Sequence, residues 1–127
     1  MLQTAVYARE PSGHAGRSRL ERQVAGLAAQ VGRQPGWRHD ATYADEAPGG
    51  TGPGLARLLA EAPGRVDLVV VDSYGRLSAN RHERAEIIDR LRWSGVAVVA
   101  LRPSQGRRLA KLVANLALAD LVGEAAR

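Results

Sequence analysis

Two short runs rich in valine constrain the fold of this chain most strongly. Residues 66–71 read Val-Asp-Leu-Val-Val-Val, and residues 96–101 read Val-Ala-Val-Val-Ala-Leu. Strands that are buried on both faces of a sheet have such near-continuous apolar sequences. Parallel strands of this kind need crossover connections, which are usually helices. We therefore expect helices to flank these two strands and to cover both faces of the sheet that contains them.

The segments before these runs add two weaker strands and two loops. Residues 2–7 are typical of a first strand, and residues 41–43 of a weak second one. Glycine, serine and proline dominate residues 10–17 and, more strongly, residues 45–54, and both stretches are predicted to be loops. The neighbouring carboxylates of Asp45 and Glu46 are therefore expected to be solvated rather than to hold a metal ion.

Helix starts are indicated by two capping patterns. Ser18 is followed three residues later by Glu21, and Asn80 is followed in the same way by Glu83. Helices are expected over about 18–35, 55–62, 80–94 and 104–126. Strands that alternate with helices predict an α/β fold with three layers: a mostly parallel central sheet, helices on both faces, and a long C-terminal helix.

Composition excludes several classes of protein and site. The 127 residues are expected to form a single domain, 1–127, without an appended DNA-binding module. Cysteine is absent and only three histidines are present, so we expect no disulfide, no metal site and no cofactor. No apolar run is long enough to span a membrane and no signal peptide is evident, which favours a cytoplasmic protein with no membrane partner.

The charge of the chain permits a polyanionic partner. The formal net charge is +5 and the pI is near 10.7. Lys111 is the only lysine, so nearly all of the positive charge is arginine, which can bind phosphate through two parallel hydrogen bonds. GC-rich coding explains the same bias without any ligand. DNA is thus one partner that the charge allows but does not require.

Parallel sheets bind ligands at the carboxyl ends of their strands, so the loops after Tyr7, Tyr43 and Val71 form the expected functional edge. Their motifs, in chain order, resemble the catalytic domain of serine recombinases, the resolvase/invertase family, whose first strand ends Tyr-x-Arg-x-Ser. The matching segments are Tyr7-Ala8-Arg9, Leu20-Glu21-Arg22-Gln23, Asp45 to Thr51, Pro53-Gly54-Leu55, Val66 to Val71, Arg76-Leu77-Ser78, Ile87 to Leu91, Gly95-Val96 and Gly106-Arg107.

This resemblance implies a particular chemistry. In the family a serine hydroxyl attacks a DNA phosphate, and arginines stabilise the charge that develops on the phosphate oxygens. Arg9, Gln23 and Arg76 match the family's phosphate-binding positions, although Gln23 could equally bond loop backbone and the two arginines could lie on the surface. The final helix is also apolar enough to pair with a second subunit, so a homo-oligomer formed through the C-terminal helix is expected, with packing on the sheet as the alternative.

The departures from the family pattern fall on the chemistry. Pro11 stands where the pattern has its serine, and proline has no hydroxyl. Gly52 and Ala79 replace arginines, and Gly75 replaces an acidic residue. Ser12, next to Pro11, is the one serine that could act as the catalytic nucleophile instead, if the loop shifted its register.

Three functional hypotheses follow from this pattern. The first is a recombinase-like domain with a degenerate active site that acts as a dimerising accessory or regulatory domain, related to site-specific DNA recombination. The second is an active small serine recombinase that uses Ser12. The third is a protein-interaction domain that makes no contact with DNA.

Overall fold

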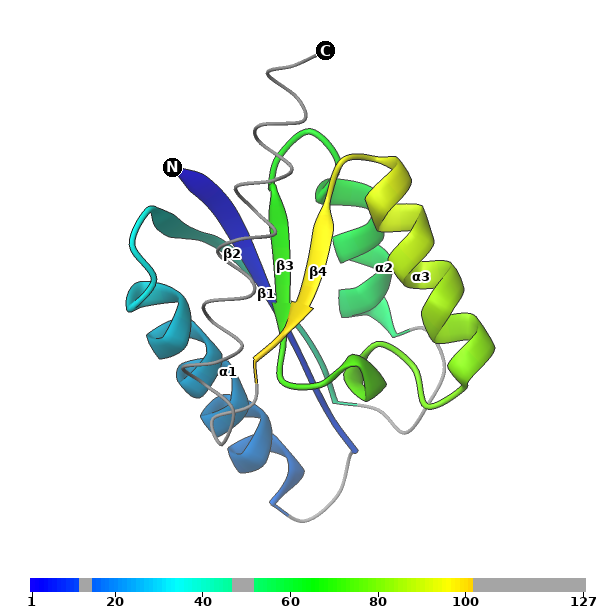
Figure 1. The fold of residues 1–127 in the computed structure, drawn as a ribbon. Coiled ribbons are helices and arrows are strands. Elements are labelled where there is room, and N and C mark those ends of the chain that lie inside the picture. Colours follow the sequence, from blue (N-terminus) through cyan, green and yellow to red (C-terminus); the bar gives the residue numbers. More distant parts are fainter. Residues whose placement is uncertain (12–14, 47–51, 102–127) are drawn as a thin grey trace.

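The computed structural model describes residues 1–11, 15–46 and 52–101, which form an α/β domain around one parallel sheet (Figure 1). Within this part of the chain, four strands lie in the order β2-β1-β3-β4. The elements are β1 (Leu2–Glu10), α1 (Gly16–Gly32), β2 (Trp37–Glu46), α2 (Pro53–Glu61), β3 (Leu68–Val71), the 3₁₀ turn η1 (Tyr74–Arg76), α3 (Arg81–Trp93) and β4 (Ala97–Ala100). The expected parallel α/β sheet is confirmed. The expected helix at 104–126 lies outside the described residues.

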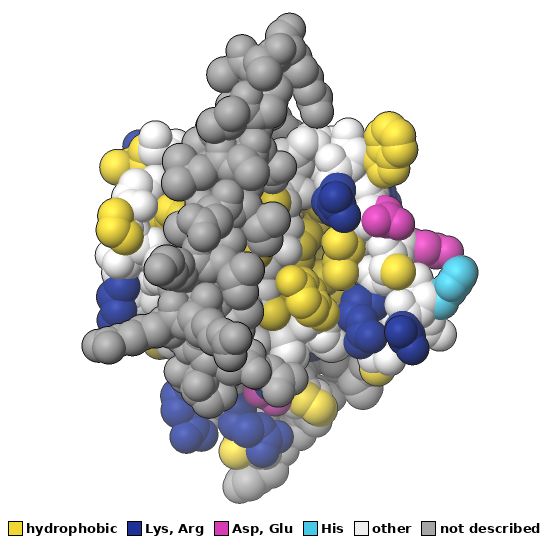
Figure 2. Space-filling model, in the orientation of Figure 1, with side chains coloured by type: hydrophobic (Ala, Val, Ile, Leu, Met, Phe, Trp, Pro, Cys, Tyr) yellow, Lys and Arg dark blue, Asp and Glu magenta, His cyan; other side chains and the backbone are white. Residues whose placement is uncertain are grey.

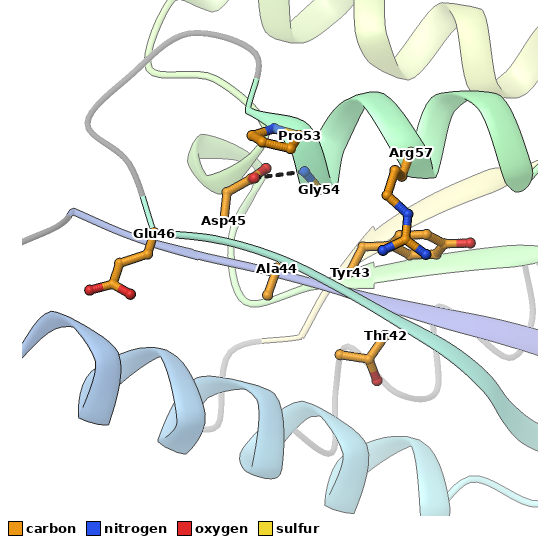
Figure 3. A pocket seen from close by; sticks show the side chains of 8 residues that line it. All are labelled: Thr42, Tyr43, Ala44, Asp45, Glu46, Pro53, Gly54 and Arg57. Carbon is orange, nitrogen blue, oxygen red and sulfur yellow. Dashed lines mark hydrogen bonds between the residues drawn. The ribbon is translucent and has the colours of Figure 1, made fainter.

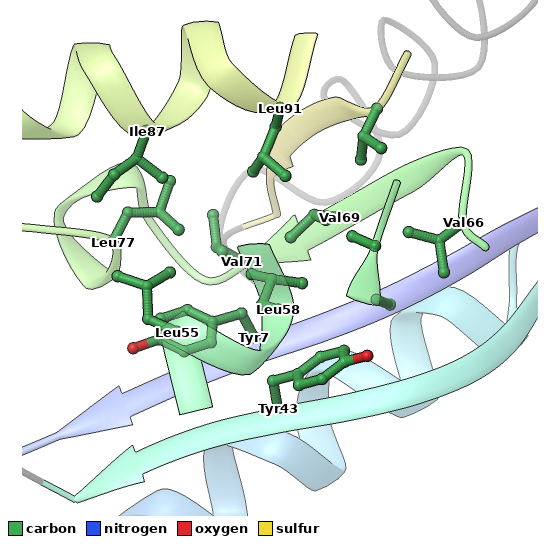
Figure 4. Packing of buried hydrophobic residues seen from close by; sticks show 13 residues of the cluster. Tyr7, Tyr43, Leu55, Leu58, Val66, Val69, Val71, Leu77, Ile87 and Leu91 are labelled. Carbon is green, nitrogen blue, oxygen red and sulfur yellow. The ribbon is translucent and has the colours of Figure 1, made fainter. Parts of the chain in front are cut away.

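Helices cover both faces of the sheet, with α1 on one face and α2 and α3 on the other (Figure 1). Because side chains alternate between faces along a strand, each face has its own core. The core under α2 and α3 includes the side chains labelled in Figure 4: Tyr7, Tyr43, Leu55, Leu58, Val66, Val69, Val71, Leu77, Ile87 and Leu91. The core on the α1 face contains Val6, Leu27, Val31, Trp37, Leu68, Val70, Val99 and Leu101.

Strand β1 is central and pairs differently with its two neighbours. It pairs with β2 along its whole length, from Leu2 to Glu10, with one register shift between Thr4 and Ala5. It pairs with β3 only from Thr4 to Tyr7. The last residues of β1 therefore extend beyond the end of β3, where their backbone groups need partners from elsewhere.

Strand β2 is much longer than the sequence indicates, and it takes in part of the predicted loop. It runs over ten residues, whereas only 41–43 have a strand-like sequence. Its first half reads Arg38-His39-Asp40, which has low strand propensity, but pairing with β1 supplies the hydrogen bonds. Asp45 and Glu46 belong to this strand, so the prediction of a loop starting at Asp45 was wrong. Residues 47–51 lie outside the described part of the chain.

The two capping predictions had opposite outcomes. At α3, the Asn80 side chain accepts a hydrogen bond from the Glu83 N–H at 3.0 Å, as predicted. At α1, the helix begins at Gly16, so Ser18 lies inside it and caps nothing. A Cβ at Gly16 would lie 2.5 Å from the Pro11 carbonyl oxygen, so glycine allows the helix to start against the end of β1.

Candidate functional site

Gln23 holds the end of β1 in place of a strand. The Arg9 N–H donates to Gln23 Oε1 at 3.0 Å, and Gln23 Nε2 donates to the Arg9 carbonyl oxygen at 3.2 Å. A neighbouring parallel strand would satisfy the same two groups, but β3 has already ended at this level. Of the two interpretations of Gln23 left open by the sequence, the structure supports bonding to backbone, and it places that bond beside the other candidate residues.

Arg76 reaches the same point from the segment after β3. Its Nη1 donates to the Arg9 carbonyl oxygen at 3.0 Å, and its Nη2 donates to Asp72 Oδ2 at 3.4 Å. The Arg76 Nε is buried and has no hydrogen-bond partner among the described residues. Arg76 is thus fixed at the carboxyl edge of the sheet by η1, and is not a freely solvated surface arginine.

Arg9 is buried, with a relative exposure of 6%, so it is not a surface arginine either. Ala5 and Tyr7 point into the core under α2 and α3, whereas Val6 points to the α1 face. Alternation along β1 therefore starts the Arg9 side chain on the α2/α3 face. The sequence-predicted residues Arg9, Gln23 and Arg76 do meet at one place, through the Arg9 backbone.

Glu10 adds a carboxylate to this place, which the sequence did not single out. Its Oε1 accepts a hydrogen bond from Gln23 Nε2 at 3.0 Å and lies 3.5 Å from Arg76 Nη1. Its Oε2 lies 3.8 Å from Arg19 Nε. The strand pattern alone could have placed Glu10 on the α1 face, but not beside Arg76, which is 66 residues further along the chain.

Asp45 caps α2 from the end of β2, as Figure 3 shows. Its Oδ1 accepts from the Gly54 N–H at 2.7 Å, and its Oδ2 accepts from the Leu55 N–H at 2.8 Å. The Tyr7 hydroxyl donates to the same Oδ2 at 2.7 Å. Asp45 is only 4% exposed, so the expectation of a solvated carboxylate was wrong for this residue. Glu46 is exposed and points the other way, toward α1 (Figure 3).

The Asp45 cap also changes the electrostatics around Tyr7. Burial raises the pKa of the Tyr7 hydroxyl, and the hydrogen bond to Asp45 raises it further, while the positive charge of Arg9 opposes the shift. The hydroxyl therefore stays protonated and remains a donor to Asp45 at neutral pH. This makes Tyr7 a structural donor between β1 and β2.

The glycines at the start of α2 are explained by the same carboxylate. Gly52 is the N-cap residue, and a Cβ there would lie 2.5 Å from Asp45 Oδ1. A Cβ at Gly54 would overlap the Ala44 carbonyl oxygen. On this backbone, a side chain at the position where the family pattern has an arginine would require the Asp45 carboxylate to move away from the start of α2. Glycine at position 52 leaves the cap in place, which the sequence alone did not indicate.

The other positions that depart from the family pattern are exposed to solvent and leave space for a side chain. Pro11, Gly75 and Ala79 are exposed. A Cβ at Gly75 would meet only the Ser73 Oγ, at 3.8 Å. Side chains at Gly75 and Ala79 would therefore fit without a collision. Ser12, the alternative nucleophile, lies outside the described residues, so its distance from Arg9 and Arg76 stays untested.

Among the described residues, no group of three or more His, Asp or Glu side chains could hold a metal ion. No helix in the same part of the chain is long and apolar enough to cross a membrane. On the face drawn in Figure 2, arginine side chains gather in separate groups over α1 and α3, with acidic side chains near them.

The family comparison decides the class of this domain. Residues 4–121 match the family model described as Resolvase, N terminal domain. The matched region contains the candidate residues Arg9, Gln23 and Arg76. The chain belongs to the resolvase family. The resemblance that the sequence motifs indicated is therefore confirmed, and the domain is related to site-specific recombination.

Solved structures of similar fold support this assignment. The C-terminal catalytic domain of ISC1926 TnpA, an IS607-like serine recombinase, is 25% identical to the resolvase domain described here, with a TM-score of 0.71 over 91% of this chain and 78% of that one. The N-terminal catalytic domain of TP901-1 integrase is 21% identical, with a TM-score of 0.67 over 96% of this chain and 95% of that one. A resolvase family site-specific recombinase from Streptococcus pneumoniae is 15% identical, with a TM-score of 0.68 over 97% of this chain and 90% of that one. The last two show the fold alone. No curated protein gave a significant match.

Proposed function

We propose that this resolvase domain associates with the DNA backbone through Arg9 and Arg76 but does not cut it, and that it acts as a dimerising accessory or regulatory domain. The observation that carries the proposal is the carboxyl edge of the sheet. The segments that hold Arg9 and Arg76 meet there, while the residue in the nucleophile position, Pro11, has no hydroxyl. Buried or semi-buried arginines suit phosphate binding, because they stay charged and are already oriented.

The loss of cutting follows from the chemistry of the reaction. A phosphoserine linkage needs an oxygen nucleophile, and the pyrrolidine ring of Pro11 offers none. A missing arginine at such a site typically costs about 2–4 kcal/mol of transition-state stabilisation. Gly52 and Ala79 stand at two such positions, so turnover would fall by several orders of magnitude even with a substitute nucleophile.

A cleavage assay separates this proposal from an active enzyme that uses Ser12. The protein is incubated with supercoiled plasmid, and the products are resolved in denaturing detergent. We expect no relaxed plasmid and no covalent protein–DNA adduct. An adduct that is present in the wild type and absent from Ser12→Ala would overturn the proposed loss of cutting.

A binding assay separates it from a protein-interaction domain without DNA contact. Fluorescence anisotropy with a labelled duplex is measured over a series of salt concentrations. Affinity should fall steeply with salt, since each neutralised phosphate contributes about −0.9 to the log–log slope. Arg76→Ala should reduce the slope by about one contact, whereas the exposed α3 residue in the control Arg92→Ala should leave it nearly unchanged. Absence of binding at low salt would favour the interaction domain.

The dimerising part of the proposal is supported by the family and by the apolar sequence of the expected C-terminal helix. The segment expected to form the dimer helix lies outside the described residues. Sedimentation velocity over a range of protein concentrations tests it. A single monomeric species at all concentrations would contradict dimerisation without affecting the DNA-binding part.

A further inference from the structure

Glu10 lies between two arginine side chains on the α1 side of the candidate site. Its carboxylate lies between Arg76 and Arg19, at 3.5 Å and 3.8 Å from their nearest nitrogens, and it accepts the hydrogen bond from Gln23. The side chain is only 14% exposed. The Glu10 carboxylate thus already occupies the position beside these arginines that a phosphate group would take.

The local sequence keeps Glu10 there. Glu10 is the last residue of β1, and Pro11 restricts the residue before it to extended conformations. Alternation along the strand then directs the Glu10 side chain to the α1 face, on the side opposite to Arg9. Gln23, which already holds the Arg9 backbone, fixes the carboxylate with its remaining N–H.

The carboxylate lines a groove between α1 and the segment after β3. This groove has a volume of about 370 Å³. Its lining residues are Glu10, Arg19, Arg22, Gln23, Gly26, Leu27, Gln30, Asp72 and Arg76. Three arginines face two carboxylates in it, so the groove keeps a formal excess of one positive charge. Without Glu10 the excess would be two.

We infer that this groove is a binding site for a DNA backbone phosphate, formed by Arg19, Arg22 and Arg76, and that the Glu10 carboxylate competes with the phosphate for those arginines. The inference rests on the proposed association with DNA and extends it to two residues of α1. Both terminal nitrogens of Arg76 already face carboxylates, those of Glu10 and Asp72. An incoming phosphate must therefore displace Glu10 or bind beside its negative charge.

Neutralising Glu10 tests the competition. Glu10→Gln keeps the shape of the side chain and an oxygen that can accept from Gln23, but it removes the charge. We expect this variant to bind a labelled 20-base-pair duplex about five-fold more tightly than the wild type at low salt, as the loss of one like charge at contact distance predicts. Its log–log salt slope should be steeper by about one phosphate contact.

The control must change the net charge equally at a distant place. Glu86→Gln serves this purpose, because Glu86 lies on α3 with its side chain 70% exposed. It should bind the duplex nearly as the wild type does. If Glu10→Gln and Glu86→Gln bind equally, the competition is wrong.

Arg22→Ala, compared with Arg92→Ala, tests the groove in the same assay. A salt slope unchanged by Arg22→Ala would remove Arg22 from the site.

A second measurement does not depend on DNA. Arginine Nε–H resonances are followed by NMR while inorganic phosphate is added to the wild type and to Glu10→Gln. We expect a shift of the Arg76 resonance at a lower phosphate concentration in the variant. If the duplex fails to bind while phosphate behaves as expected, the proposed association with DNA is wrong and the competition at the groove stands. Equal responses to phosphate would overturn the competition itself.

Discussion

Asp45 joins three segments through one carboxylate. It accepts a hydrogen bond from the Tyr7 hydroxyl of β1 and one from each of two backbone N–H groups in the first turn of α2. Negative charge is favourable at a helix N-terminus, where the first N–H groups lack partners within the helix. Pro53 at the start of α2 has no N–H to satisfy, so the carboxylate serves the next two residues.

Tyr7→Phe should lower the free energy of unfolding by about 2 kcal/mol at neutral pH, because it removes a buried hydrogen bond to a charged acceptor. The pKa of Tyr7 is raised in the folded protein, so the stability that it contributes is present below the unfolded pKa of about 10 and is lost as pH rises above it. Urea unfolding at pH 8 and at pH 10.5 checks this. The gap between wild type and variant should narrow at the higher pH, and a constant gap would contradict it.

Gly52→Ala should destabilise the domain by about 1–3 kcal/mol, because the new Cβ would force the Asp45 carboxylate away from the start of α2. Gly75→Ala is the matched control, since its Cβ meets nothing closer than 3.8 Å. Thermal unfolding of the two variants measures the difference. Equal melting temperatures would show that Asp45 does not restrict position 52.

The candidate site shows what single residues reveal in a sequence and what they do not. Arg9 and Arg76 could be predicted to lie at one edge, because the fold class brings the ends of neighbouring strands together, whereas Gln23, within a helix, was indicated only by the family resemblance. The role of Glu10 could not, because it depends on the contact with Arg76 from a distant loop. Asp45 was placed in a loop because the glycines that follow it suggested one, whereas it lies at the end of a strand that pairs with β1.

At the scale of elements, the N-termini of α1 and α3 are capped differently. The Asn80 side chain caps α3, and the Asn80 N–H donates to Ser78 Oγ at 3.1 Å. This N–H would otherwise pair with Glu83 in a full capping box. At α1 the N-cap residue is Ala15, in the left-handed conformation with φ of 68°, and no side chain caps the helix.

Asn80→Ala should cost about 1 kcal/mol of stability through the loss of the cap on α3. Ser18→Ala, at the start that the sequence wrongly indicated, should be neutral or slightly stabilising, because alanine is the better helix former inside a helix. Chemical denaturation of both variants gives the comparison. A larger loss for Ser18→Ala would mean that α1 begins at Ser18 after all.

The elements also show why boundaries are harder to predict than types. The type of every element in the described residues, apart from the short turn η1, was indicated by the sequence. The largest error is β2, where Arg38, His39 and Asp40 gave no strand signal. These three residues are polar, and pairing with the central strand β1 decides their conformation.

At the scale of the whole molecule, the sheet separates two cores. Trp37 is buried on the α1 face, while Tyr7 and Tyr43 are buried on the face of α2 and α3. Both cores share the strands between them, so the loss of one face exposes apolar side chains at the sheet itself. The two cores should therefore unfold together.

Two optical probes can check this cooperativity. Trp93 is 90% exposed, so the change in tryptophan fluorescence on unfolding reports mainly on Trp37 and the α1 face. Tyrosine absorbance reports mainly on Tyr7 and Tyr43, on the other face. In a urea titration the two curves should share one midpoint. Separate midpoints would mean that one layer unfolds before the other.

The strand order has a consequence for how the chain reaches its fold. The first of the described strands, β1, is an inner strand of the sheet, and its partners β2 and β3 begin only at Trp37 and Leu68. No adjacent pair can form as a hairpin, so every strand pairing must close a long loop first. Such topologies fold more slowly than helical domains of similar size. On the ribosome, β1 therefore has two unpaired edges until β2 and β3 have both been synthesised, and unpaired strand edges are prone to aggregation.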